Sequence, residues 1–194
     1  MDLQASQIVQ LFDKRIAKGL VLDLGMGNAH DLAFLSKAGR EGIGYDKDPK
    51  CVINAKAIAQ RYNLPITFEV SDIRNLNFPT NKFVAVIAVN ILNYLKKVEI
   101  DRLAKKIVQA LVPGGLVIIQ AFNLDDNSAT KSNGFDSFKY WFKSEDLQKV
   151  FSQMDLLYYA YQVCRSDCLP SKINMHGDQY RGTISFVSQK RRVL

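Results

Sequence analysis

The chain has 194 residues, of which 47% are hydrophobic and 23% charged, and its formal net charge is +7. This length suits one well-buried domain and is short for two, so we expect a single domain over residues 1–194. No apolar run is long enough to span a bilayer, and the first residues lack the basic-then-apolar order of a signal peptide, so a cytoplasmic protein without membrane contact is expected.

The early part of the chain predicts a strand between two helices. Apolar residues at helical spacing predict an amphipathic leading helix within residues 1–18. Residues 21–24 read as a buried strand, which two glycines break before a helix over 29–37. Either Asn28 or Asp31 could cap that helix.

The elements that follow alternate between strands and helices, which predicts an α/β fold with a doubly wound, mostly parallel sheet. The final two strands have no helix between them and should pair antiparallel, giving a seven-stranded sheet with an antiparallel last strand. The expected strands are 42–46, 66–70, 83–89, 116–121, 156–163 and 183–188, and the expected helices are 49–62, 100–111 and 146–151.

A strand, a glycine turn and a helix gather unpaired N–H groups at one spot, which suits a polar or anionic part of a ligand. The pattern is Asp23-x-Gly25-x-Gly27-x-Ala29. A dinucleotide fingerprint needs a small residue where this chain has His30, so an NAD-linked oxidoreductase is the lowest-ranked reading.

Ligands of open parallel sheets lie beyond the carboxyl ends of the strands, so the residues that follow each strand are the candidates. Asp46 follows the second strand, where a carboxylate can accept hydrogen bonds from ribose hydroxyls. Asp72 follows the third strand, and Asn90 and Ile91 follow the fourth. The alternative is that both aspartates cap helices or turns and that Asn90 is a turn residue.

The glycine loop resembles motif I of the class I S-adenosylmethionine methyltransferases, with Ala29 in place of the usual third glycine. Further segments resemble the tellurite-resistance methyltransferase family. They are Asp46-Lys47, Asp72-Ile73-x-x-Leu76-x-Phe78, Pro113-Gly114-Gly115 and the aromatic-rich segment 134–147.

The resemblance implies a Rossmann-like methyltransferase fold, S-adenosylmethionine as cofactor and S-adenosylhomocysteine as product. It places Asp72 at the adenine amino group, Ile73 beside the ring and Asn90 near the methyl donor. The full set of implied cofactor-binding residues is Asp23, Gly25, Met26, Gly27, Asn28, Ala29, Asp46, Lys47, Asp72, Ile73, Asn90 and Ile91.

Two long segments should lie at the same edge as the cofactor. Residues 123–142 are too long for an ordinary connection and carry several aromatic side chains, which predicts a lid; the alternative is a surface loop that covers the core. The second segment carries His176 and Arg181 ahead of the last strand, which predicts that they serve the methyl acceptor. Alternatively, Arg181 pairs with Asp178 and His176 is a solvated loop residue. The family's Arg beside this His is Gly177 here.

No disulfide framework or metal site is expected, because the three cysteines are few and irregularly spaced. Cys164, Cys168 and His176 could be imagined as metal ligands, but the set lacks a fourth partner.

The leading hypothesis is methyl transfer to a small molecule that is anionic or a soft nucleophile. The alternatives are an RNA or protein methyltransferase and a non-catalytic adenosylmethionine-binding module. The positive charge favours nucleic acid, but the basic residues are scattered, and the group at Arg102, Lys105 and Lys106 reads as a solvated helix face. The sequence leaves the oligomeric state open.

Overall fold

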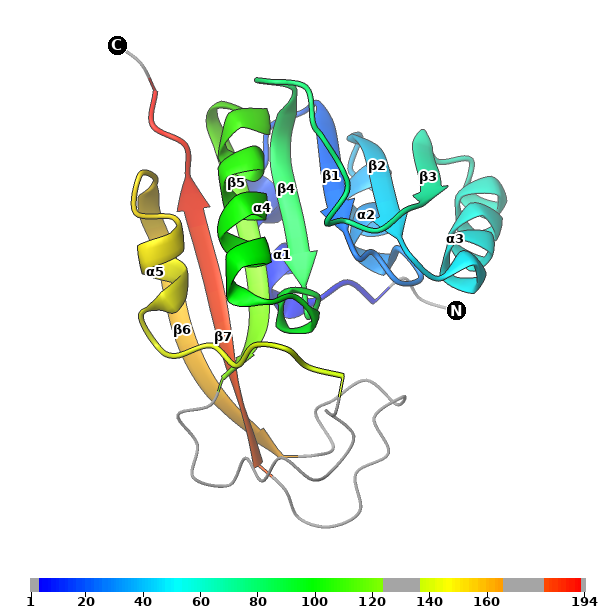
Figure 1. Ribbon diagram of the computed structural model, residues 1–194. Coiled ribbons are helices and arrows are strands. Elements are labelled where there is room, and N and C mark those ends of the chain that lie inside the picture. Colours follow the sequence, from blue (N-terminus) through cyan, green and yellow to red (C-terminus); the bar gives the residue numbers. More distant parts are fainter. Residues whose placement is uncertain (1–3, 124–136, 166–179, 193–194) are drawn as a thin grey trace.

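The computed structural model describes residues 4–123, 137–165 and 180–192, and the side chains of all of these except 162–165 and 180–182. Within this part of the chain, seven strands form one sheet with helices on both faces (Figure 1). The strands are β1 (Leu20–Leu24), β2 (Glu41–Asp46), β3 (Ile66–Val70), β4 (Phe83–Val89), β5 (Leu111–Asn123), β6 (Asp155–Arg165) and β7 (Tyr180–Gln189). The helices are α1 (Gln7–Phe12), α2 (His30–Lys37), α3 (Pro49–Tyr62), α4 (Lys97–Ala110) and α5 (Asp146–Val150), with 3-10 turns η1 (Asp13–Arg15) and η2 (Leu92–Tyr94).

The sheet has the strand order β3-β2-β1-β4-β5-β7-β6. β1 to β5 pair in parallel, whereas β7 runs antiparallel to both β5 and β6. The expected doubly wound sheet with an antiparallel last strand is therefore confirmed. The strand order reverses between β1 and β4, so the loops that follow these two strands meet at the carboxyl edge of the sheet (Figure 1).

Alternating strand residues build two cores, one on each face of the sheet. Leu22 and Leu24 of β1 join the core under α4 and α5, whereas Val21, the residue before Leu22, joins the core under α1, α2 and α3. β4 and β5 alternate in the same way. Because both faces are covered, these central strands read as nearly continuous apolar runs.

The leading helix is shorter than expected, because α1 ends at Phe12 and continues only as the turn η1. The guanidinium of Arg40 explains this end. It donates to the carbonyls of Asp13 and Ile16 at 2.6 and 2.7 Å, and it also pairs with the Asp13 carboxylate at 2.7 Å. Because these carbonyls accept hydrogen bonds from Arg40, which lies between α2 and β2, the helical segment ends here.

β5 is longer than the expected strand 116–121, since it begins at Leu111 and includes the Pro113-Gly114-Gly115 segment. The segment is an irregularity within the strand, which shifts the register against β4 between Phe83 and Ala85. Its backbone is bonded to the residue that follows β7, because the N–H of Gly114 donates to the carbonyl of Lys190 at 2.8 Å. Across the described residues, no helix is both long and apolar enough to cross a membrane.

Candidate active site

β1 ends in a tight glycine loop that is held against the end of β2. The backbone N–H groups of Gly25 and Met26 both donate to the carbonyl of Tyr45, at 2.8 and 3.1 Å. Gly25 has a φ of +68°, and a Cβ placed on it would lie only 2.4 Å from Cγ1 of Ile91. The loop needs glycine here both for the left-handed backbone and for the close approach of the chain after β4.

Replacing Gly25 with alanine should lower the free energy of unfolding by about 3 kcal/mol, since overpacking adds to the cost of the left-handed backbone. Urea unfolding measures this. Gly39 is the matched control, because its φ is +87° but nothing lies within 4 Å of a Cβ placed there. Gly39→Ala should cost about 1 kcal/mol, and an equal cost for the two variants would contradict the packing argument.

The helix after the loop is not capped by Asn28 or Asp31, so that expectation is wrong. Its N-cap is Ala29, which has a φ of 58° and makes no side-chain hydrogen bond. The Asp31 carboxylate instead accepts the N–H of Ser6 at 2.6 Å, and Oδ1 of Asn28 accepts from Nδ2 of Asn54 at 3.3 Å. Both side chains are engaged by partners from other parts of the chain.

Asp46 ends β2 and ties that strand to the glycine loop. Its Oδ2 accepts the N–H of Gly27 at 2.9 Å, and its Oδ1 accepts the N–H of Asp48 at 2.9 Å. Each oxygen keeps a further lone pair for a ligand hydroxyl. Lys47 follows, with its Nζ 5.9 Å from the centroid of the Tyr94 ring.

Asp23 is only 3% exposed, directly beneath this loop. Burial raises the pKa of Asp23 well above its ordinary value, and the carboxylates of Asp31 and Asp46 raise that pKa further. The pKa of Asp31 is also raised, mainly by burial. A positively charged ligand group would relieve the repulsion among these carboxylates.

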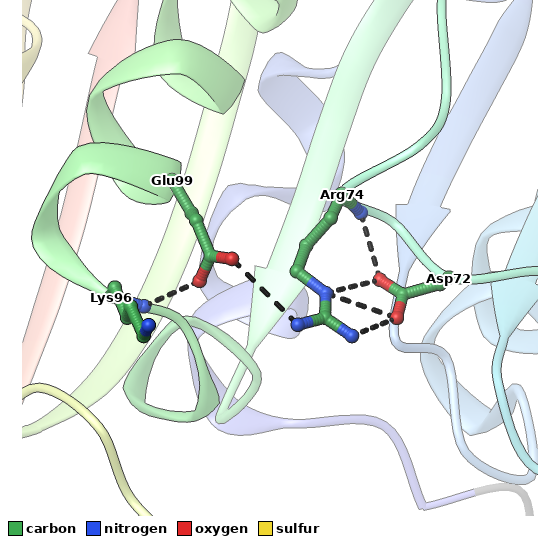
Figure 2. A network of polar contacts seen from close by, with 4 residues as sticks. All are labelled: Asp72, Arg74, Lys96 and Glu99. Atoms are coloured by element: carbon green, nitrogen blue, oxygen red, sulfur yellow. Dashed lines mark hydrogen bonds and ion pairs between the residues drawn. The ribbon is translucent and has the colours of Figure 1, made fainter.

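Asp72 follows β3 and is held by Arg74 (Figure 2). Nε of Arg74 lies 2.9 and 3.0 Å from the two oxygens of Asp72, and Nη1 lies 3.7 Å from Glu99 on α4. Hydrogen bonds from Arg74 lower the pKa of the Asp72 carboxyl. Ile73 between them is buried, at 6% exposure.

Asn90 directly follows β4 and has a left-handed conformation, with a φ of 55°. Its N–H donates to the carbonyl of Gln120 at 2.8 Å. Its Oδ1 is buried and has no hydrogen-bond partner among the described residues. The strained backbone and the unsatisfied oxygen mark this position as one where a ligand or a water would be stabilised.

A cavity of about 330 Å³ opens at this carboxyl edge. Six of the expected cofactor-binding residues line this cavity: Gly25, Asp46, Lys47, Asp72, Ile73 and Ile91. The side chains of Asp23 and Met26 are buried and do not line it, and Met26 packs against Gly44. Gly27, Asn28, Ala29 and Asn90 are also not in its lining. The lining residues are Gly25, Asp46, Lys47, Ser71, Asp72, Ile73, Arg74, Ile91, Tyr94, Leu95, Ser137 and Lys139.

Several of these residues were not predicted from the sequence. Arg74 lies two residues after Asp72, a spacing at which an arginine can reach back to a carboxylate. The sequence therefore contained a signal from which this contact could have been predicted. Tyr94 lies in η2, and its ring meets that of Phe138 at a centroid distance of 4.8 Å. Nothing in the sequence relates Tyr94 to Ser137 and Lys139, which are more than forty residues away.

Residues 21–115 match the protein family described as "Methyltransferase domain". The chain is 28% identical over 118 residues to 2-heptyl-1-hydroxyquinolin-4(1H)-one methyltransferase of Mycobacteroides abscessus, which is 60% of this chain and 52% of that protein. The fold matches that of TehB from Haemophilus influenzae with a TM-score of 0.80 at 18% identity, over 94% of this chain and 61% of that chain. Residues 21–115 thus match a methyltransferase domain, and the chain shares the fold of TehB.

A second relative is not named as a methyltransferase. It is Hemagglutinin 1 of Eikenella corrodens, 26% identical over 149 residues, which is 76% of this chain and 48% of that protein. The chain thus spans about half the length of the curated relatives it matches. The likeness to TehB agrees with the resemblance to the tellurite-resistance methyltransferases.

The residues of this methyltransferase domain fit a bound adenosylmethionine. One cavity is lined by the Asp46 carboxylate, which can accept hydrogen bonds from ligand hydroxyls, by the Asp72 carboxylate and by the apolar side chain of Ile73. Asp23 and Asp31 add two buried carboxyl groups that interact electrostatically, and a positively charged group of that cofactor would relieve the repulsion between them.

The expected acceptor residues lie at the boundary of the described structure. His176 lies outside the described residues. Arg181 lies in β7, where its backbone pairs with Cys164 of β6. The segment expected to form a lid is described only at Asn123 and from Ser137 onward.

Within the described residues, no group of three or more His, Cys, Asp or Glu side chains is arranged to hold a metal ion. Of the three residues considered as metal ligands, Cys168 and His176 lie outside the described residues, and so does the side chain of Cys164.

Proposed function

We propose that the protein binds S-adenosylmethionine in the cavity at the carboxyl edge and transfers its methyl group to a small-molecule acceptor, leaving S-adenosylhomocysteine. The observation that carries this proposal is the convergence of Gly25, Asp46, Asp72 and Ile73 on one cavity. These residues lie at the end of β2 and in the loops after β1 and β3, in the arrangement that the class I methyltransferase resemblance implies.

In this proposal each wall of the cavity has a separate role. Asp46 accepts hydrogen bonds from the ribose hydroxyls, while its bonds to Gly27 and Asp48 keep the carboxylate oriented. Asp72 accepts the adenine amino group, and Ile73 packs on the ring. The carboxylates behind the loop favour the positively charged end of the cofactor.

The bound cofactor supplies a carbon already activated for in-line displacement, so the protein mainly has to align the acceptor and exclude water. Aromatic side chains at the mouth suit that task. The Phe138 ring contacts Tyr94, Trp141 and Phe122, at centroid distances of 4.8, 5.3 and 5.5 Å. This cluster ties the described end of the 123–142 segment to the chain after β4.

A small, anionic or soft-nucleophilic acceptor is the finer part of the proposal. The Mycobacteroides abscessus relative, which is named as a methyltransferase of a hydroxyquinolinone, supports it. We assign orientation of the acceptor to His176 and Arg181, where the arginine fork would hold an oxyanion and the histidine could take a proton. Transfer to RNA is the second candidate, because the net charge is +7.

Calorimetric titration with adenosylmethionine, adenosylhomocysteine and NAD tests the cofactor assignment. We expect saturable binding of the first two and none of NAD. Incubation with labelled adenosylmethionine and small acceptors should then give adenosylhomocysteine in step with the methylated product. Tight binding of NAD alone, or methyl transfer only to RNA, would overturn the proposal.

A further inference from the structure

A second hollow, of about 340 Å³, lies between α4 and the turn that follows β3. It has a different character from the cofactor cavity, because charged and polar side chains make up nearly all of its lining. The lining residues are Arg74, Asn75, Glu99, Arg102, Leu103 and Lys106.

The hollow carries more positive than negative charge. Arg102 and Lys106 are one turn apart on α4, and like charges at this spacing repel each other unless an anion lies between them. Among the described residues, no carboxylate forms an ion pair with Arg102. Lys106 donates to the neutral carbonyl of Leu76 at 2.7 Å.

Glu99 is the carboxylate in the lining, and it is already engaged. Its Oε2 accepts the N–H of Lys96 at 2.7 Å, which caps α4, and its Oε1 lies 3.7 Å from Arg74 (Figure 2). Glu99 therefore does not balance the charges of Arg102 and Lys106.

Arg74 lines both the hollow and the cofactor cavity. Its side chain spans from Asp72 toward Glu99 (Figure 2). The guanidinium engages both oxygens of Asp72, the carboxylate assigned to the adenine amino group. An anion in the hollow would compete with Asp72 for Arg74.

We propose that this hollow is a binding site for a small phosphate-bearing molecule, held by Arg74, Arg102 and Lys106, and that its occupation frees Asp72 for the cofactor. Guanidinium groups bind phosphate oxygens as bidentate forks, and Lys106 adds a point charge. Because the ligand withdraws Arg74 from Asp72, phosphate and cofactor bind with positive coupling. Only this coupling rests on the proposed function.

Titration calorimetry of the full chain with inorganic phosphate and with glycerol 3-phosphate, at low ionic strength, tests the site. We expect saturable binding that Arg102→Gln weakens about tenfold, since a charge-assisted pair of bonds is lost. Tighter binding of the ester would identify a phosphate monoester as the ligand, whereas equal or weaker binding would identify free phosphate.

Lys105→Gln is the matched control, because Lys105 is an exposed cation on the same helix outside the hollow. Its phosphate affinity should match that of the parent. Absence of saturable binding, or equal weakening by Lys105→Gln and Arg102→Gln, would overturn the site. The site would also be overturned if the protein bound a single-stranded oligonucleotide tightly but bound neither phosphate nor its ester.

The coupling has its own measurement. Saturating phosphate should tighten adenosylmethionine binding about fivefold in the parent and leave it unchanged in Arg74→Gln. An unchanged affinity in the parent would overturn the coupling. If adenosylmethionine does not bind under any condition, the proposed function fails, whereas the phosphate titration still decides the site.

Discussion

Replacing Asn93 with alanine should lower the free energy of unfolding by about 4 kcal/mol, because it removes three hydrogen bonds to backbone groups, two of which are buried. Asn93 is fully buried, and its Nδ2 donates to the carbonyls of Phe122 and Tyr140, both at 3.0 Å. Its Oδ1 accepts the N–H of Phe122 at 2.9 Å. One side chain thus joins η2, the end of β5 and the segment that returns from 137 to 142.

The stability loss should come with weaker cofactor binding, because Ser137 and Lys139 of that segment line the cavity. Urea unfolding and calorimetry measure the two effects separately. Asn54→Ala is the control, because Asn54 is exposed and its side chain makes one long hydrogen bond of 3.3 Å. If both variants lose less than about 1 kcal/mol, Asn93 does not hold the segment in place.

Regular elements with strong patterns could be predicted from the sequence closely. The bounds expected for β3, β4 and α3 match the structure: Ile66–Val70, Phe83–Val89 and Pro49–Tyr62. For α3 the physical reason is local, since Asp48 caps the helix through the N–H of Lys50 at 2.9 Å and proline takes the first helical position. Burial on both faces explains β4 in the same way.

Elements that depend on distant partners could not be predicted in this way. The end of the leading helix depends on Arg40, which reaches Ile16 across 24 residues. The irregular start of β5 depends on the residue that follows β7, because Gly114 bonds to Lys190. Asn93 has no local pattern that distinguishes it from a turn residue, and its partners lie 29 and 47 residues away.

The candidate site likewise has a part that could be predicted from local sequence and a part that depends on distant residues. Asp46 and Asp72 could be predicted, because an acid at the end of a parallel strand must lie at the carboxyl edge. Their surroundings could not be predicted. Arg74 engages Asp72, and Lys139, from a segment well beyond β5 in the sequence, lines the cavity.

Replacing Asp46 with alanine should weaken adenosylmethionine binding roughly a thousandfold, about 4 kcal/mol, because two charge-assisted hydrogen bonds to the ribose are lost. The carboxylate also accepts the N–H groups of Gly27 and Asp48, so its removal loosens the glycine loop as well. Asp46→Asn keeps one acceptor oxygen without the charge, and it should lose less affinity than the alanine variant.

Asp48 offers a matched control for this change, because it is an acid two residues away and is absent from the cavity lining. Its Oδ1 accepts the N–H of Lys50 at 2.9 Å, which caps α3. Asp48→Ala should therefore cost about 1 kcal/mol of unfolding free energy and leave cofactor affinity within about twofold of the parent. Titration calorimetry on the parent, Asp46→Ala, Asp46→Asn and Asp48→Ala separates a contact with the ligand from a general loss of structure. If Asp46→Ala binds the cofactor as tightly as the parent, the carboxylate at the end of β2 does not hold the ribose, and the assignment of this cavity to adenosylmethionine loses its main polar contact.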